Sequence, residues 1–334
     1  MYSILDVAKL ANVSKSTVSR VLSGNSYGVS AKTKEKVEKA AKELGYVKNS
    51  IASSLRTNQT KTIILIIPDI TNNFWAEVAR GAQDYLEKKG YSLILVNTDW
   101  EEDNYTKYLD LALTKGVDGI LINTYSSSIN RLKDIKIPIV LLGNAYLHSP
   151  YTRVGSNTLE GIREALEYLY ENGHRKIGIV ASHTDTKQSK KIENRLSVYN
   201  QFLESKNIEF NDNYYFSVEY SMKGGISLAT SISIMDNPPT AILAGNDLIA
   251  IGLINESRKL DIKIPEDLSI IGVDDIPISS IVYPKLTTIA KPKREIGEKA
   301  AEAIINVING KNVNNNYKLP VNLIIRETVE NINK

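Results

Sequence analysis

The hydrophobic and polar positions at the start of the chain alternate with a helical period. Within residues 4–23, Val18, Val21 and Leu22 are spaced i, i+3 and i+4, which predicts a short helix with these side chains facing inward. The polar residues between them then face outward, and all can donate hydrogen bonds: Lys15, Ser16, Thr17, Ser19 and Arg20. Donors are what guanine edges and phosphates require in a major groove, although an ordinary surface helix would carry similar residues.

A second short helix is predicted just before this one. Leu5, Val7 and Ala8 give it a narrow inner face, and the small Ala8 lets the two helices cross closely. Asn12 stands where the turn needs a left-handed backbone, and Ser14 offers its hydroxyl as the N-cap of the following helix. The pattern predicts a helix-turn-helix.

A third helix is predicted from the N-cap Ser30 to Leu44, and Gly45 ends it. Its apolar stripe consists of Val37, Ala40, Ala41 and Leu44. Its outward lysines, Lys32, Lys34 and Lys36, can either contact a sugar-phosphate backbone or simply keep the surface soluble.

From Lys61 onward, short β-branched runs alternate with longer helical stretches, which is typical of parallel α/β units. Most of these runs end in a polar residue, and ligands of open parallel sheets bind beyond the carboxyl ends of strands. A break near 155–157 divides the run into two halves, each expected to form its own sheet. The predicted strands are TIILIIPD, YSLILVNTD, GILINTY, PIVLLGN, KIGIVAS, TAILAGN and LSIIGVDD.

Composition agrees with a protein of several domains. The 334 residues exceed one ordinary domain, 42% are hydrophobic, and there is no cysteine, which excludes disulfides and thiol catalysis. Residues 1–60 contain ten Lys and Arg against four Asp and Glu, a net charge of +6, whereas the whole chain carries +3. The remainder therefore carries about −3, and a basic head on a slightly acidic body suits a module that neutralises phosphates.

These segments resemble the lactose and galactose repressor family of bacterial transcription regulators. The run DVAKLANVSKSTVSRVLSG followed by VSAKTKEKVEKAAKELGYVKN matches its headpiece. The resemblance assigns base reading to Lys15, Ser16 and Arg20, and phosphate contacts to Thr17 and Ser19. With the capping Ser14, they form the predicted DNA-binding face.

The resemblance continues through NSIASSLR, where Asn49, Ala52 and Leu55 recur at three-residue spacing. So short a helix is unstable alone in water, so we expect it to form only on DNA. The resemblance implies that it pairs with its dimer mate and inserts Leu55 between base pairs in the minor groove. The alternative is a plain linker.

The resemblance covers the body through motifs such as PDITNNFWAEVARG, ENGHRKIGIV, AGNDLIAIG and IPEDLSIIGVDD. It implies an all-α headpiece (1–46), a hinge (47–60) and an α/β core (61–334) built like periplasmic sugar-binding proteins. The first lobe is expected at about 61–156 and 290–320, because a strand and helix rejoin it. The second is expected at about 157–289 and 321–334.

Seven positions match the effector contacts of the family: Asn72, Phe74, Trp75, Arg195, Tyr220, Asn246 and Asp274. We do not expect two adjacent aromatic side chains both to point inward from one helical turn. The Phe74–Trp75 pair therefore predicts a surface on which a ligand can stack. Arg195 offers planar donors to ligand oxygens, and the alternative is a surface salt bridge. Asp275 is the alternative effector contact to Asp274 if the register of the strand shifts by one residue.

Stacking aromatics with arginine, aspartate and asparagine suit a polyol, so a sugar or sugar derivative is predicted, with a purine as second choice. Family members that respond to a phosphorylated carrier protein tend to lose the arginine, so Arg195 favours a small ligand over that corepressor.

Enzymes find little support in the sequence. The three histidines, His148, His174 and His183, have no metal-ligand spacing, and neither a G-x-S-x-G elbow nor a G-K-[ST] phosphate loop occurs. We expect no metal and no cofactor, and a structural role for His174. A free solute-binding protein would carry a secretory signal in place of the head. The sequence therefore predicts a cytoplasmic homodimer, without a membrane segment, on a pseudo-palindromic operator in double-stranded DNA.

Overall fold

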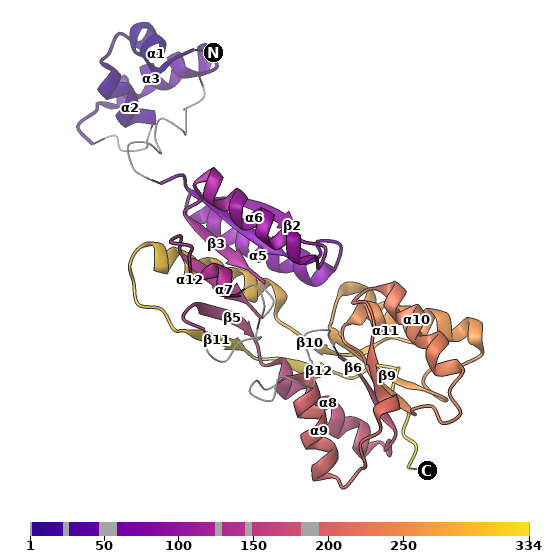
Figure 1. The fold of residues 1–334 in the computed structure, drawn as a ribbon. Helices are drawn as coiled ribbons and strands as arrows, with labels where there is room; N and C mark the ends of the chain where they lie inside the picture. The colour runs from indigo at the N-terminus through magenta and orange to yellow at the C-terminus, as the bar shows by residue number, and fades with distance from the viewer. Residues whose placement is uncertain are drawn as a thin grey trace. The chain divides into compact units, whose positions relative to one another are not determined.

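The computed structural model describes residues 2–22, 27–46, 59–123, 129–143, 149–181 and 194–333 (Figure 1). Two compact units divide the chain, Met1–Thr60 and Lys61–Lys334. We refer to the first as the headpiece and to the second as the core.

The headpiece contains three helices, α1 (Ile4–Ala11), α2 (Lys15–Leu22) and α3 (Ala31–Glu43). Ser3 caps α1 in a capping box with Asp6, and Ser30 caps α3 by accepting a hydrogen bond from the Thr33 amide. Apolar side chains of all three helices form one small core: Val7, Ala8, Ala11, Val18, Val21, Val37, Ala40 and Ala41. The predicted helices and the Ser30 cap are confirmed.

The prediction that Leu5 belongs to the inner face of α1 is wrong, since 53% of its surface is exposed. At 100° per residue, Val7, Ala8 and Ala11 share one arc of the helix, and Leu5 lies outside it. The buried arc therefore continues through Ala11 rather than Leu5.

Two six-stranded sheets form the core, and they have equivalent strand orders, β11-β5-β4-β3-β1-β2 and β12-β10-β9-β8-β6-β7. All pairs are parallel except β10 with β12. In the first sheet the strands are β1 (Thr62–Ile67), β2 (Ser92–Asn97), β3 (Gly119–Ile122), β4 (Ile139–Leu142), β5 (Thr152–Ser156) and β11 (Asn316–Leu319). In the second they are β6 (Ile177–Ala181), β7 (Tyr215–Ser217), β8 (Ala241–Leu243), β9 (Ser269–Asp274), β10 (Thr287–Ala290) and β12 (Asn322–Ile324).

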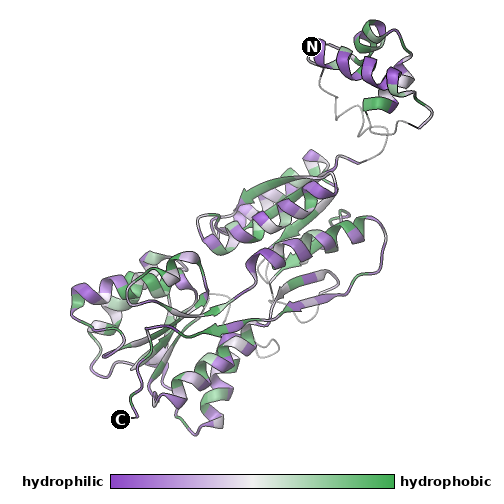
Figure 2. Ribbon diagram, turned by 180° about the vertical axis from the view of Figure 1, so that it is seen from behind, coloured by the Kyte–Doolittle hydropathy of each residue, from purple (hydrophilic) through white to green (hydrophobic). Residues whose placement is uncertain are grey.

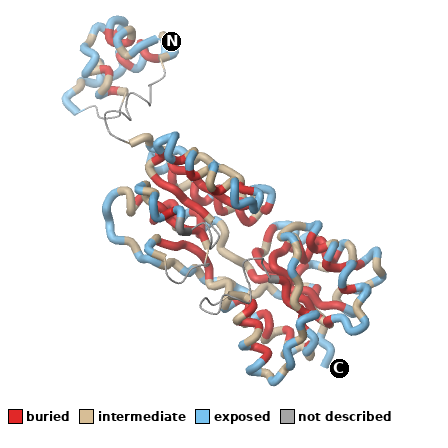
Figure 3. The backbone as a smooth tube through the Cα atoms, in the orientation of Figure 1, coloured by how far each residue is buried: buried red, intermediate tan, exposed pale blue. Residues whose placement is uncertain are grey.

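Helices cover the sheets, because parallel strands rich in β-branched residues have to be buried on both faces. They are α5 (Asn73–Lys88), α6 (Glu102–Lys115), α7 (Ile129–Leu132), α8 (Thr158–Glu171), α9 (Arg195–Ser205), α10 (Met222–Ser233), α11 (Asp247–Ser257) and α12 (Lys293–Ile308). Short 3₁₀ turns lie at Asp212–Tyr214, Arg258–Leu260 and Pro277–Ser280. The central strands are mostly hydrophobic and buried, while the helices expose polar residues (Figures 2 and 3).

Glycines let α5 and α12 pack at close range on the first sheet. A Cβ on Gly81 would lie 2.0 Å from the Arg294 carbonyl oxygen, and one on Gly297 would lie 1.9 Å from that of Val78. The two backbones therefore touch at both glycines, and neither site has room for a side chain.

The chain passes between the lobes three times. It leaves the first sheet after β5 at Asn157, returns from β10 through Lys291 and Pro292 into α12, and leaves again between β11 and β12. The Asn157 amide donates to the Leu319 carbonyl oxygen at 2.8 Å, which ties the first crossing to the third. The predicted fold, a helical headpiece with two parallel α/β lobes, is confirmed.

Candidate nucleic-acid interface and effector site

Helix α2 presents the predicted DNA-binding face of the headpiece. Val18 and Val21 are buried, while Lys15, Ser16 and Arg20 are exposed on the opposite side. The remaining members, Thr17 and Ser19, are partly exposed. The face is thus available for contact with a groove, as its period predicted.

The turn before α2 has the expected conformation. Asn12 adopts a left-handed backbone with φ 51° and ψ 51°, and it caps the end of α1. Ser14 accepts a hydrogen bond from the Thr17 amide at 3.1 Å, and its hydroxyl also pairs with those of Ser16 at 2.7 Å and Thr17 at 2.8 Å. Ser16 can still meet a base, because a hydroxyl both donates and accepts. Both turn predictions are confirmed.

The predicted hinge residues Asn49, Ala52 and Leu55 lie outside the described residues, as do His148 and His183.

The predicted effector residues of the first lobe lie at the start of α5, and they are more buried than expected. Phe74 and Trp75 are only 6% and 8% exposed, and their rings meet edge to face with centroids 4.9 Å apart. The prediction that both rings cannot point inward is therefore wrong. The first turn of α5 lies between the hydrophobic interior of the first lobe and the junction of the lobes, and both rings are buried there. Phe74 also contacts the crossing segment, since the Lys291 ammonium lies 3.9 Å from its ring centroid.

Arg195 begins α9 in the second lobe, behind a capping box formed by Asn194 and Ser197. Its guanidinium donates to the Gly245 carbonyl oxygen at 2.5 Å and to the Tyr220 hydroxyl at 3.3 Å. These contacts bring three strand-end segments of the lobe together.

Asn72 and Asn246 both serve as N-caps in the structure. The Asn72 side-chain oxygen accepts from the Phe74 amide at 3.0 Å, and that of Asn246 accepts from the Ile249 amide at 2.9 Å. The Asn246 amide nitrogen also donates to the Tyr220 carbonyl oxygen at 3.4 Å, so Asn246 links the start of α11 to the segment of Tyr220.

Asp274 is the acidic centre of the site. It is 5% exposed, has a backbone φ of 117°, and pairs with the Lys291 ammonium at 3.2 Å. Lys293 donates to the carbonyl oxygens of Asp274 and Asp275, both at 2.7 Å. A positive φ in a non-glycine residue is strained and is often found at functional sites.

Asp275, the alternative to Asp274, faces another partner. Its carboxylate accepts a hydrogen bond from Arg326 at 2.7 Å, and Arg326 also donates to the Leu286 carbonyl oxygen. Each aspartate thus has its own ion pair, Asp275 with Arg326 and Asp274 with Lys291 in the crossing between the lobes.

Asp247 lies beneath Asp274 and is fully buried. It accepts hydrogen bonds from the Ile276 amide at 2.8 Å, the Ser279 hydroxyl at 2.7 Å and the Thr288 hydroxyl at 2.5 Å. Burial, helped by the charge of Asp274, raises the pKa of Asp247 to about 6 against the effect of these donors. Asp247 thus fastens the segment that follows Asp274 at the end of β9.

Trp100 and Lys291 were not predicted as site residues. Trp100 follows β2, in a turn where both it and Asp99 have positive φ, and its ring packs at 6.1 Å from that of Tyr220 in the other lobe. The signal for Trp100 was an aromatic residue just beyond a polar strand end. Lys291 gave no such signal, because its partners Phe74 and Asp274 are remote in sequence.

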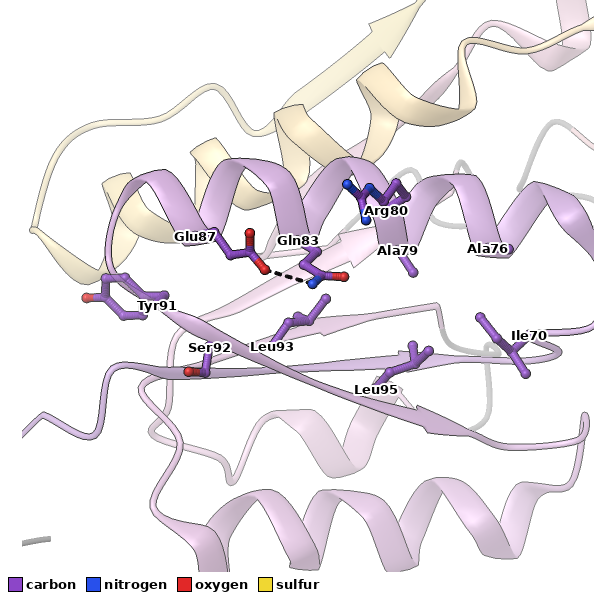
Figure 4. A pocket seen from close by; sticks show the side chains of 10 residues that line it. All are labelled: Ile70, Ala76, Ala79, Arg80, Gln83, Glu87, Tyr91, Ser92, Leu93 and Leu95. Atoms are coloured by element: carbon purple, nitrogen blue, oxygen red, sulfur yellow. Dashed lines mark hydrogen bonds between the residues drawn. The ribbon is translucent and has the colours of Figure 1, made fainter. Parts of the chain in front are cut away.

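A groove of about 460 Å³ lies elsewhere on the first lobe, between α5 and the edge strand β2 (Figure 4). Leu93 and Leu95 project from β2 toward the helix, where Gln83 donates to Glu87 at 2.7 Å. We call it the α5 groove; its lining is Ile70, Ala76, Ala79, Arg80, Gln83, Glu87, Tyr91, Ser92, Leu93 and Leu95.

Other chemistry finds no support in the described part of the chain. Among those residues, no three metal-ligating side chains cluster, and no helix is both long and apolar enough to cross a membrane. His174 is buried and hydrogen bonds to the Thr240 hydroxyl at 3.0 Å and the Glu330 carbonyl oxygen at 3.1 Å. Its role is structural, as the sequence predicted.

Comparison with known proteins agrees with both parts of this architecture. Residues 3–49 match the model of bacterial regulatory proteins of the lacI family, and residues 166–329 match a periplasmic binding protein-like domain. The HTH-type transcriptional repressor PurR of Vibrio vulnificus (strain CMCP6) is 33% identical over 338 residues, covering both chains completely.

Two further relatives cover nearly the whole chain. The ribose operon repressor of Haemophilus influenzae is 33% identical over 334 residues, covering 98% of this chain and 99% of its own. The crystal structure of the lac repressor dimer bound to operator and the anti-inducer ONPF superposes with a TM-score of 0.86 at 26% identity, covering 98% and 99% of the two chains.

The chain is 33% identical to such a repressor over its whole length, and its headpiece matches the family model. Together these findings decide the class of the protein. It is a DNA-binding repressor with an effector-binding core, not an enzyme, and the chain belongs to the lacI family of bacterial regulatory proteins.

Proposed function

We propose that the effector of this repressor is a carbohydrate or carbohydrate derivative, bound where the two lobes of the core meet. Two sets of contacts between the lobes carry the proposal. Trp100 packs against Tyr220, which accepts a hydrogen bond from Arg195, and Phe74 lies beside Lys291, which pairs with Asp274. Aromatic faces stack on the apolar face of a sugar ring, while the guanidinium and carboxylate bind its hydroxyls.

A thermal-shift screen of neutral sugars, sugar derivatives and purines tests this proposal. Arg195→Ala should abolish the shift caused by the true ligand, because its donors are lost. Arg163→Ala is the matched control, since Arg163 lies in the same lobe and pairs with Glu160 at the surface of α8. A shift that survives Arg195→Ala would contradict the assigned site.

A purine is the second candidate, favoured by the full-length similarity to PurR proteins. The same aromatic rings would stack on a base, and Asp274 would accept from a ring nitrogen. Hypoxanthine and guanine therefore belong in the screen, and a shift with a purine but with no sugar would replace the carbohydrate.

On the DNA side, we propose that α2 enters the major groove of each half of a pseudo-palindromic operator. Lys15, Ser16 and Arg20 would read bases, while Ser14, Thr17 and Ser19 would position the helix on phosphates. We propose further that Asn49, Ala52 and Leu55 form a hinge helix on the operator. Leu55→Ser should then abolish specific DNA binding and leave effector affinity intact, whereas loss of both would indicate misfolding.

We also propose that the protein is a homodimer that uses the α5 groove and the segment 277–283. Edge residues Ile70 and Leu95 are 36% and 38% exposed, and Ile281 and Tyr283 are each 76% exposed. Such apolar patches mark protein interfaces, and a twofold axis would present two headpieces to two half-sites. Leu95→Asp with Ile281→Asp should yield monomers in sedimentation velocity, and an unchanged dimer would exclude these surfaces.

Dimeric binding implies a linked equilibrium between effector and operator. Whatever factor the effector applies to operator affinity, the operator must apply to effector affinity. Effector titrations with and without operator DNA give one value of the coupling, and operator titrations with and without effector give a second. Disagreement between the two values would exclude a single linked state.

A further inference from the structure

Lys291 occupies an unusual position for a charged side chain. It lies in the second crossing between the lobes, immediately after β10, and only 15% of its side chain is exposed. Its ammonium touches the first lobe at the Phe74 ring, 3.9 Å away, and the second lobe at the Asp274 carboxylate, 3.2 Å away. A buried ammonium is costly unless counter-charges surround it, so the balance of charge here is informative.

Two ammonium groups lie beside Asp274, one on its carboxylate and one on its backbone. Besides Lys291, Lys293 reaches the backbone of the same residue, donating to its carbonyl oxygen and to that of Asp275. The Asp275 carboxylate is already paired with Arg326, and both oxygens of Asp247 are directed at Ile276, Ser279 and Thr288. The charges that act on Lys291 are the carboxylate of Asp274 and two cations, Arg195 and Lys293, so positive charge is in excess around this ammonium.

The positive charge works against Lys291. Burial lowers the pKa of its ammonium; Asp274 opposes this, whereas Arg195 and Lys293 act in the same direction as burial. Like charges gathered at a buried point destabilise the protein when no ligand is bound, and strongly perturbed charged groups of this kind cluster at functional sites.

Hydrogen-bond donors also remain available. An ammonium has three N–H groups. In the described contacts, Lys291 directs one of them at the Asp274 carboxylate and also faces the Phe74 ring. Lys293 uses two of its own on backbone carbonyl oxygens. One N–H of each lysine is left for an acceptor. A phosphate or carboxylate accepts several such bonds at once and supplies the missing negative charge.

We propose that the effector carries an anionic group, a phosphate or a carboxylate, and that Lys291 binds this group at the junction of the lobes with support from Lys293. This inference rests on the proposed function, and it narrows the carbohydrate derivative to an acidic one. Since Lys291 contacts both lobes, an ion pair between Lys291 and the ligand would change how the two lobes are oriented relative to each other.

The test uses the full-length protein and matched probes: glucose, glucose 6-phosphate and gluconate, and ribose with ribose 5-phosphate. Binding is followed by intrinsic fluorescence and by calorimetry, because the chain has only two tryptophans and both Trp75 and Trp100 lie at the site. Lys291→Gln removes the charge, and Lys223→Gln, an exposed lysine of α10, is the matched control.

We expect an anionic probe to bind, and Lys291→Gln to weaken it on the order of tenfold to a hundredfold, as loss of a charged hydrogen bond does. The Lys223→Gln variant should bind like the parent, and the neutral partner of the bound probe should be much weaker. The phosphate and carboxylate probes identify which acid is recognised.

Other outcomes overturn the inference. If only a neutral sugar binds, the inference fails while the proposed function stands; if no sugar of either kind binds, both fail. If an anionic probe binds equally to the parent and Lys291→Gln, the lysine has only a structural role. Should Lys291→Gln unfold, Lys293→Gln gives an independent reading, and an anionic affinity unchanged by it would contradict the proposal.

Discussion

The indole of Trp100, which follows β2 in the first lobe, packs against the ring of Tyr220 in the second, with centroids 6.1 Å apart and planes inclined by 54°. Tyr220 in turn accepts a hydrogen bond from Arg195. The aromatic contact therefore joins one lobe directly to the predicted ligand-binding arginine of the other.

Trp100→Ala should weaken effector binding by about 0.5–1.5 kcal/mol, the usual contribution of an aromatic pair, because closure over the ligand loses one contact. Isothermal titration with the effector measures this change. Trp100→Phe should restore most of the affinity, and headpiece binding to DNA without effector should not change. Equal affinities for Trp100→Ala and the parent would show that this contact plays no part in closure.

Arg20→Ala should lower specific operator affinity by about 1–3 kcal/mol if Arg20 reads a base. Non-specific DNA binding should fall much less. Lys36→Ala on α3 provides the contrast: if it contacts only phosphates, it should weaken specific and non-specific binding alike and reduce the salt dependence. Electrophoretic mobility shifts at several salt concentrations separate the two patterns, and a uniform loss for Arg20→Ala would remove it from base reading.

Asp247 should make stability depend on pH. Its pKa is about 6 when folded and close to the ordinary 3.8 when unfolded, so the folded protein holds the proton longer. The resulting stabilisation is complete below about pH 4 and is lost as the pH rises through 6, by roughly 2–3 kcal/mol.

The Asp247→Asn variant lacks this titration. Its side-chain amide, in the suitable orientation, can still form hydrogen bonds with Ile276, Ser279 and Thr288. Relative to the parent, the variant should therefore become more stable by up to about 2–3 kcal/mol between pH 4 and pH 7. Urea unfolding at both pH values measures the difference. A constant difference between the two proteins would mean that Asp247 titrates alike in both states.

Gly297→Ala should destabilise the core by at least about 2 kcal/mol, because its Cβ would lie 1.9 Å from the Val78 carbonyl oxygen. At an exposed helix position the same change stabilises by about 1 kcal/mol, so the sign itself is diagnostic. Denaturant unfolding tests it, with exposed Glu298→Ala of the same helix as control. Increased stability of Gly297→Ala would show that α5 and α12 separate easily.

The accuracy of the sequence predictions follows the range of the interactions concerned. Helix caps and the Asn12 turn depend on neighbours within four residues, and they were predicted correctly. Long β-branched strands such as β1 were also evident. Strand β5 was not, because TRVGS has a single large apolar residue, and its pairing partners β4 and β11 lie elsewhere in the chain.

The site shows the same limit. Strand ends and the family pattern pointed to Arg195 and Asp274, but the ion pairs of Asp274 with Lys291 and of Asp275 with Arg326 join residues that are remote in sequence. The burial of Phe74 likewise depends on Lys291, which sequence spacing does not reveal. Long-range pairing decides which of several suitable side chains faces a ligand.

The glycine contacts between α5 and α12 restrict how a signal can spread. Both helices begin beside the effector residues, α5 after Asn72 and α12 after Lys291, and their backbones interlock at Gly81 and Gly297. Interlocked helices cannot slide along each other, so they must translate and rotate as one body. A displacement of the first turn of α5 would therefore also tilt Gln83 and Glu87 on the α5 groove, and in the proposed dimer this tilt would be doubled between the two subunits.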